Sequence, residues 1–232
     1  AQIGNLLRYL DDMGLKENTI VMLLSDNGAS QEGGPTGLMD EMKYFNMVPE
    51  NVDKAVEKLD DIGGPKSHTN YPWGWAQAGN CPMRWYKQTT HGGGVRDPFI
   101  IRWPKVIKDK GGKRDQFHHV TDVMPSILEI LGLEPPKVFN GIEQLEVAGT
   151  SFAYLLNSES EPTRKKVQYF EMFGNRAIWS DGWKAVSRHE FRQDYDKEEW
   201  ELFHLDRDIS ETNNLSKACL LYTSPSPRDQ RG

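Results

Sequence analysis

The sequence predicts an α/β protein: a large domain in which helices flank a mixed sheet, followed by a small C-terminal α+β domain with an antiparallel sheet. In the large domain, a segment of helical period leads into residues 20–24, an uninterrupted apolar run that is too short for a helix. Such a run is typical of a strand that is covered on both faces within a parallel sheet. After residue 160, short β-type segments separated by turns indicate antiparallel strands instead.

The large domain is predicted to span residues 1–160. Its helices are indicated by apolar residues that recur every three or four positions, and their ends by capping residues or glycines. The predicted elements, in chain order, are a helix over residues 3–13 that ends before Gly14, the strand over 20–24, a helix over 52–62 that ends before Gly63, a strand over 99–101, and a helix over 123–131 with Thr121 or Asp122 as its cap and Gly132 at its end. The segments 28–47 and 63–98 lack a clear period and are expected to be irregular.

The small domain is predicted to span residues 161–216. Its expected strands are 167–172, 177–179, 183–186 and 200–205, and Ser180-Asp181-Gly182 has the residue types of a tight hairpin turn. Residues 217–232 are rich in serine, proline and arginine and show no period. We expect this tail to be disordered or to be a foreign extension.

The composition of the chain argues against two classes of partner. The 232 residues carry a formal net charge of −6, which gives no electrostatic basis for binding nucleic acid. No apolar run approaches the roughly 18 residues that a membrane-spanning helix needs, so no membrane segment is expected. The two cysteines, Cys81 and Cys219, are far apart and argue against a disulfide framework.

Polar residues follow the apolar strand directly, in the order Ser25-Asp26-Asn27-Gly28. The carboxyl ends of strands in open α/β sheets border the crevice in which ligands bind, so the side-chain oxygens of Asp26 and Asn27 are expected there. Carboxylate and amide oxygens are the ligands of hard divalent cations. The same residues are also typical of an Asn-Gly turn with an Asx cap, and the pair alone supports both interpretations equally.

A second segment, residues 87–98, combines a lysine with three consecutive glycines. Gly92, Gly93 and Gly94 let the backbone approach another group closely, and Lys87 can reach the same space. No Gly-Lys-Ser/Thr sequence follows the glycines, which excludes a phosphate-binding P-loop. From these residues alone, a glycine-rich turn beside a solvated lysine is the favoured interpretation.

Four motifs occur in order along the chain. They are Leu24-Ser25-Asp26-Asn27-Gly28-Ala29; Lys87 followed by Gly92-Gly93-Gly94-Val95-Arg96-Asp97-Pro98-Phe99-Ile100-Ile101-Arg102-Trp103-Pro104; Thr121-Asp122-Val123-Met124-Pro125-Ser126-Ile127-Leu128; and Trp200-Glu201-Leu202-Phe203-His204-Leu205-Asp206-Arg207-Asp208 with Glu211-Thr212-Asn213-Asn214-Leu215. In this order they resemble the C-terminal half of a type I sulfatase of the bacterial arylsulfatase type. The resemblance covers about residues 1–216.

The resemblance implies an alkaline-phosphatase-like fold, with a large α/β domain and a small antiparallel domain. It also implies that Asp26 and Asn27 ligate a calcium ion (Ca²⁺) and that Lys87 contacts the sulfate of the substrate, a sulfate ester of a small molecule or a glycan. Cleavage of such an ester gathers negative charge on the sulfonyl and leaving oxygens. A metal ion and a fixed ammonium group therefore stabilise the transition state.

The chain departs from the family in the segment that carries the nucleophile. Members form a formylglycine from the first residue of a Cys/Ser-x-Pro-x-Arg motif near their N-terminus, and neither Cys81-Pro82-Met83-Arg84 nor Ser224-Pro225-Ser226-Pro227-Arg228 has this spacing. The chain begins at Ala1 within a helical period. We therefore expect a fragment that lacks the nucleophile and the remaining metal ligands, and that is inactive on its own. His91 stands where many members have Glu, and we assign it no catalytic role.

Two alternatives to a sulfuric ester hydrolase stay open. One is a phosphodiester or phosphonate hydrolase of the same superfamily, and the other is a non-catalytic metal-binding module. The upstream sequence distinguishes all three, because the nucleophile motif lies there.

Overall fold

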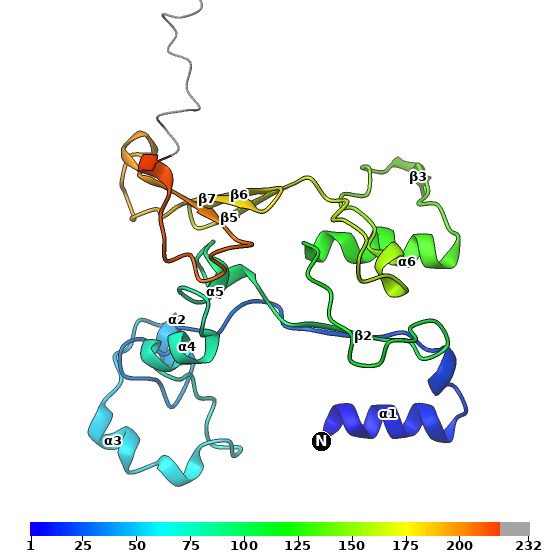
Figure 1. Ribbon diagram of the computed structural model, residues 1–232. Helices are drawn as coiled ribbons and strands as arrows, with labels where there is room; N and C mark the ends of the chain where they lie inside the picture. Colours follow the sequence, from blue (N-terminus) through cyan, green and yellow to red (C-terminus); the bar gives the residue numbers. More distant parts are fainter. Residues whose placement is uncertain (219–232) are drawn as a thin grey trace, which may run out of the picture. The chain divides into compact units, whose positions relative to one another are not determined.

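The computed structural model describes residues 1–218 (Figure 1). Its helices and strands, in chain order, are α1 (Gln2–Asp12), β1 (Val21–Leu24), α2 (Met42–Phe45), α3 (Val52–Val56), α4 (Trp73–Asn80), α5 (Gly92–Val95), β2 (Phe99–Arg102), α6 (Val123–Leu131), β3 (Val138–Phe139), β4 (Ile142–Glu143), β5 (Val167–Met172), β6 (Asn175–Ser180), β7 (Trp183–Ser187) and β8 (Trp200–His204). This mixture of helices and strands, with consecutive antiparallel strands at the C-terminal end, confirms the predicted fold class. Most of the predicted tail, residues 219–232, lies outside the described residues.

The chain divides into two compact units. Among the described residues, one unit comprises 1–23 and 99–168, and the other comprises 24–98 and 169–218. The predicted domains, residues 1–160 and 161–216, stay a prediction. No helix among residues 1–218 is long and apolar enough to cross a membrane.

The N-terminal helix and strand agree with their predicted positions. α1 ends at Asp12, and Gly14 adopts φ +68°, the left-handed conformation that ends helices. β1 pairs with β2 in a two-stranded sheet. Leu23 and Leu24 are nevertheless 43% and 44% exposed, so the prediction of a strand buried on both faces is wrong. Within the described chain β1 pairs with β2 alone, and a strand in so narrow a sheet stays partly open to solvent.

α6 begins and ends where the sequence predicts, and a buried carboxylate anchors its start. Gly132 follows the helix with φ +63°. Asp122 is fully buried, and its carboxylate accepts hydrogen bonds from the Lys165 ammonium at 2.7 Å and from the backbone N–H groups of His119 and Thr150 at 2.8 Å. Asp122 therefore caps the short 3₁₀ turn before α6 and also ties it to residues far along the chain.

The segments between β1 and β2 differ most from prediction. The helix predicted over residues 52–62 is only the short α3, capped by the Asn51 side chain and followed by a separate 3₁₀ turn at Leu59–Asp61. The segment 63–98, predicted to be irregular, contains α4 and α5. α4 has the sequence Trp-Gly-Trp-Ala-Gln-Ala-Gly-Asn and buries only Ala76. Without an apolar stripe, no helical period is visible in the sequence.

The C-terminal strands form one antiparallel sheet in the order β5-β6-β7-β8, as predicted. Asp181 and Gly182 connect β6 to β7 with φ of +44° and +83°, which is the backbone of a hairpin turn whose two central residues are left-handed. Ala177, Val186 and Phe203, from three neighbouring strands, are fully buried and form the core of this sheet.

Phe203→Ala is expected to cost about 3–5 kcal/mol of unfolding free energy, because it leaves a cavity among fully buried side chains. Phe191→Ala is the matched control: this ring is 88% exposed, and its removal is expected to change stability by less than about 0.5 kcal/mol. Urea unfolding followed by circular dichroism measures both. Equal losses in the two variants would contradict the assignment of this core.

Candidate active site

The predicted metal-binding residues follow β1 in a turn that is open to solvent. The Ser25 hydroxyl donates to the Asn27 carbonyl at 2.9 Å, and the Ser25 N–H donates to the Pro98 carbonyl at 3.4 Å. Asp26 is exposed and Asn27 is half-buried. The turn therefore leaves the Asp26 side chain accessible to a ligand.

Two segments that are far apart in the sequence meet through their backbones at this turn. The Gly28 N–H donates to the Gly94 carbonyl at 3.3 Å, and the Lys87 N–H donates to the Ala29 carbonyl at 3.0 Å. A Cβ on Gly28 would lie 1.7 Å from the Gly93 carbonyl oxygen, so no other residue fits at position 28 without moving the backbone. These are the two segments that the sequence indicates as candidate site segments, and their backbones are in contact. That the side chains of Asp26 and Lys87 share one crevice stays a prediction.

Asn80, the last residue of α4, joins the same two segments. Its amide oxygen accepts from the Ala29 N–H at 3.1 Å, and its amide nitrogen donates to the carbonyls of Trp85 and Gly93 at 3.0 and 2.8 Å. All of these groups belong to the backbone, so the sequence around them gives no sign of the contact. The helix that sequence analysis missed therefore positions the candidate site.

The Lys87 ammonium is held by a carboxylate. Its ammonium lies 2.9 Å from Oε2 of Glu32, whose side chain is only 8% exposed. The same carboxylate accepts from the Ser30 hydroxyl at 3.0 Å and from the Gln88 amide at 3.3 Å. The lysine beside the glycine-rich turn is therefore paired with a buried carboxylate and only partly solvated, since its side chain is 28% exposed. Glu32 fixes the direction of the ammonium while leaving its other N–H donors available.

The backbone that carries Lys87 is strained on both sides of it. Trp85 and Gln88 have φ of +65° and +72°, a conformation that residues other than glycine rarely adopt. Such strain persists only where surrounding contacts fix it, and it is common at functional sites. Here the fixing contacts include a hydrogen bond of 2.6 Å between the side-chain amides of Gln31 and Gln88.

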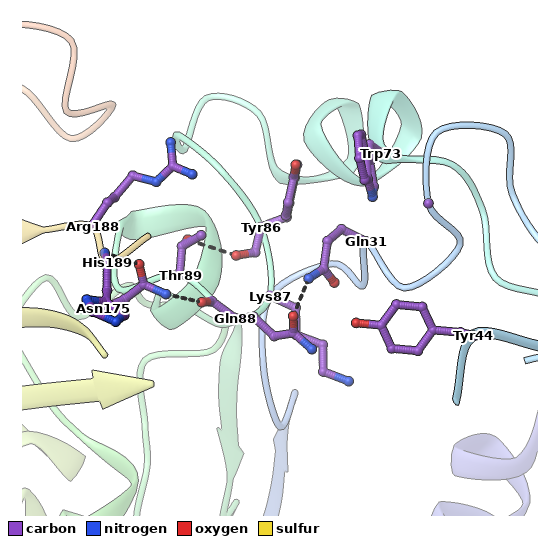
Figure 2. Close-up of a pocket in the computed structure, with 11 residues that line it drawn as sticks. Gln31, Tyr44, Trp73, Tyr86, Lys87, Gln88, Thr89, Asn175, Arg188 and His189 are labelled. Carbon is purple, nitrogen blue, oxygen red and sulfur yellow. Dashed lines mark hydrogen bonds between the residues drawn. The ribbon is translucent and has the colours of Figure 1, made fainter. Parts of the chain in front are cut away.

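A pocket of about 290 Å³ opens beside Lys87 (Figure 2). Figure 2 shows the amides of Gln31 and Gln88 meeting between two groups of side chains, with Arg188 and His189 on one side and Tyr44 and Trp73 on the other. The pocket is lined by Gln31, Gly34, Tyr44, Trp73, Tyr86, Lys87, Gln88, Thr89, Asn175, Arg188 and His189. It therefore combines two cations, three primary amides and three aromatic rings.

Asp97 contributes a second carboxyl group near the turn after β1. Burial raises the pKa of Asp97 to about 6, and the negative charge of Asp26 contributes to the rise. The two carboxyl groups therefore lie close enough to repel each other. A cation between them would relieve that repulsion. No cluster of three His, Cys, Asp or Glu side chains able to hold a metal ion occurs among residues 1–218.

A buried ion pair supports the glycine-rich turn from the C-terminal sheet. The Glu211 carboxylate binds the Lys184 ammonium at 2.7 Å through one oxygen and accepts the Gly92 N–H at 2.7 Å through the other. Both charged side chains are almost fully buried. Burial lowers the pKa of Lys184, and the Glu211 charge opposes the shift. The Glu211 backbone is strained, with φ +55°. In this conformation its carboxylate reaches both Lys184 and Gly92.

His91 completes this support. It is fully buried, and its Nε2 lies 2.9 Å from Oε2 of Glu201, whose other oxygen lies 2.9 Å from the Arg84 guanidinium. Burial lowers the pKa of His91, so the ring is neutral at pH 7 and donates Nε2–H to the carboxylate. The ring therefore holds the turn, and it is not among the residues that line the pocket.

Cys81, His68 and His119 are not among the residues that line the pocket. Cys81 is exposed, and the exposed ring of His68 pairs with Glu41 at 3.0 Å. His119 caps the 3₁₀ turn before α6. Glu32, Glu201 and Glu211 were missed as site residues. In the sequence, only their position in the C-terminal motif could have indicated a role for Glu201 and Glu211. No motif includes Glu32.

Comparison with known proteins identifies matching families and relatives over most of the chain. Residues 1–133 match the family described as Sulfatase, and residues 82–221 match N-sulphoglucosamine sulphohydrolase, C-terminal. An uncharacterized sulfatase of Schizosaccharomyces pombe is 33% identical over 93% of this chain, and an arylsulfatase of Klebsiella aerogenes is 29% identical over 72% of it.

The same fold occurs in solved structures. One, from work on glycosaminoglycan metabolism by Bacteroides thetaiotaomicron, has a TM-score of 0.57 with 23% identity and covers 94% of this chain and 39% of its own. The chain spans only 37% of the S. pombe relative and 34% of the K. aerogenes relative. It therefore corresponds to little more than a third of each of these two relatives.

Glu211→Gln is expected to lower the unfolding free energy by about 3–5 kcal/mol, because it leaves the Lys184 ammonium buried without a counter-charge. Adding Lys184→Met should recover part of this loss, since no unpaired charge then remains buried. The control is Asp11→Asn, which breaks the exposed pair with Lys16 and should cost less than about 1 kcal/mol. Thermal and urea unfolding measure all three. If Glu211→Gln and Asp11→Asn cost the same, the buried pair does not support the turn.

Proposed function

The chain belongs to the sulfatase family, and from this premise we propose that the protein containing it hydrolyses sulfate esters and that this chain supplies the sulfate-binding lysine and part of a calcium site. The observation that carries the proposal is the placement of Lys87. A buried carboxylate orients its ammonium, strained backbone flanks it, and a pocket opens beside it. The adjoining backbone is bonded to the turn that follows Asn27.

Lys87 suits the charge that develops in this reaction. As a sulfate ester is cleaved, negative charge gathers on the sulfonyl and leaving oxygens. A lysine is a compact point charge with three donors, and Glu32 engages one of them. The remaining donors are thereby directed in advance, and a donor that needs no reorganisation stabilises a transition state most effectively.

We further propose that Asp26 and Asn27 hold the calcium ion, and their chemistry fits it. Both present oxygen ligands, which hard cations prefer. The mutual repulsion of Asp26 and Asp97 is the electrostatic situation that a bound cation relieves. When bound, such an ion supplies Lewis-acid stabilisation of the sulfonyl oxygens. Asp26 and Asn27 are too few ligands for an ion that takes about 6 to 8 oxygens, so further ligands must complete the site.

Within the 232 residues the Cys/Ser-x-Pro-x-Arg spacing occurs at Ser160-Glu161-Pro162-Thr163-Arg164, downstream of Asp26 and Lys87, whereas family members carry the nucleophile motif near their N-terminus. Stabilising a transition state accelerates only an attack that some group makes. We therefore propose that the chain on its own does not turn over a sulfate ester, and that its role is to bind and orient the sulfate.

The activity is tested by assaying the whole gene product and the 232-residue chain on 4-nitrophenyl sulfate. We expect turnover from the whole gene product and none from the chain. In the whole gene product, Lys87→Ala should lower kcat by about 10²–10³-fold, the loss typical of removing one charge-stabilising donor. Lys66→Ala, which removes an exposed lysine, should leave kcat unchanged.

Each contrary result has a distinct meaning. Multiple turnovers by the chain that vanish in Lys87→Ala would place the nucleophile within the 232 residues. A preference of the whole gene product for 4-nitrophenyl phosphonate or phosphodiester would identify a hydrolase of those esters instead. If the whole gene product turns over none of these esters, the result would favour the alternative of a non-catalytic metal-binding module.

Calcium binding is tested on the chain by isothermal titration calorimetry. Binding should be weak because the ligand set is short, and Asp26→Ala should weaken it by about tenfold or more, which is about 1.4 kcal/mol. Asp12→Ala, which removes an exposed carboxylate on α1, is the control. Unchanged affinity in Asp26→Ala would refute the ligand assignment.

A further inference from the structure

The pocket beside Lys87 contains a second cation, Arg188. Arg188, just after β7, is exposed and lines the pocket. Its guanidinium carbon lies 4.2 Å from the centroid of the Trp85 ring. Among residues 1–218 no carboxylate lies within ion-pairing distance of Arg188, whereas Lys87 is paired with Glu32. The two cations of this pocket therefore differ: one is oriented by an internal partner, and the other is available to an external anion.

Contacts of the neighbouring residue His189 hold the backbone beside Arg188 in place. The next residue, His189, binds Glu198 through Nδ1 and stacks on Tyr195 with 4.4 Å between ring centroids. The His189 N–H donates to the Asn175 side chain at 3.1 Å, and the Asn175 amide donates to the Gln88 carbonyl at 3.0 Å. These contacts fix the backbone that carries Arg188 against the segment that carries Lys87, within the same compact unit.

The opposite side of the pocket offers surfaces for a ring that bears hydroxyl groups. Tyr44 and Trp73 are exposed aromatic residues that line the pocket across from Arg188 (Figure 2). Such rings provide a flat apolar face with a polar tip. Oε1 of Gln31 is buried and has no hydrogen-bond partner. A buried acceptor without a donor is costly, and a hydroxyl or amide N–H of a ligand would satisfy it.

We propose that this pocket binds sulfated carbohydrates that carry a second anionic group, and that Arg188 recognises that second group. The inference rests on the proposed function, because Lys87 takes the first sulfate. The planar guanidinium forms two parallel hydrogen bonds to a sulfate or a carboxylate, while the sugar ring lies against Tyr44 and Trp73. Arg188 is thus a specificity-determining residue and not a catalytic one.

Ligand titrations of the 232-residue chain, followed by NMR, test this inference. The probes are glucose 6-sulfate, glucosamine 2-N,6-O-disulfate, and a disaccharide that joins a uronic acid to a 6-sulfated hexosamine. The disulfated sugar should bind about tenfold more tightly than the monosulfated one, as expected for one added charge-assisted bidentate contact. The third probe shows whether a carboxylate serves as well as a second sulfate.

The variants separate the roles of the two cations. Arg188→Ala should abolish the preference for the second anion and leave the affinity for glucose 6-sulfate unchanged, and Arg188→Lys should restore only part of the preference. Arg192→Ala is the matched control, because Arg192 also stacks on an aromatic ring, that of Phe191, and does not line the pocket. Lys87→Ala should weaken all sulfated probes alike.

The outcomes distinguish this inference from the proposed function. Binding of sulfated probes that depends on Lys87 but shows no preference for a second anion would overturn the role of Arg188 alone. An equal loss of preference in Arg188→Ala and Arg192→Ala would also overturn it, since a general surface charge would then explain the effect. Binding of no sulfated probe would overturn both the inference and the sulfate-binding role of Lys87.

Discussion

The candidate site depends on the two contacts of the buried Glu211 carboxylate. This carboxylate lies between the Lys184 ammonium, on the C-terminal sheet, and the Gly92 N–H, at the start of the glycine-rich turn. A buried ion pair adds little net stability compared with apolar residues of the same size, but it specifies one arrangement strongly because each alternative leaves a charge unpaired. Its value here is positional: the sheet fixes the turn, and the turn determines where Lys87 and the Gly28 backbone meet.

Local sequence could predict those parts of the fold that depend on local contacts. α6, the hairpin after Ser180 and the strand before Asp26 follow from periodicity, capping and turn chemistry within a few residues. α4 could not be predicted, because its role is to place one side chain, that of Asn80, against distant backbone groups. Such a helix needs no apolar stripe, and so it shows none.

The candidate site was predictable to a similar degree. The sequence pointed to the two segments that carry Asp26 and Lys87, because a strand end and a run of glycines are visible in a single chain. The partners of those residues were not visible. Glu32 lies 55 positions from Lys87, and Glu211 lies 119 positions from Gly92. Tertiary structure decides which residues pair over such separations. In the sequence alone, a glutamate that orients a cation cannot be distinguished from a glutamate on the surface.

The glycines at the turn pack directly against backbone carbonyl groups, and this limits how such a site can change during evolution. Cβ atoms added to Gly28, Gly93 or Gly94 would each lie within 2.1 Å of a backbone carbonyl oxygen. The layer beneath the site is therefore main chain packed on main chain, and substitutions elsewhere in the pocket leave its spacing intact. Side chains such as Tyr44, Trp73 and Arg188 stand outside this layer and are free to diverge. A lineage can thus acquire a new substrate by exchanging pocket residues while it inherits the reaction geometry unchanged.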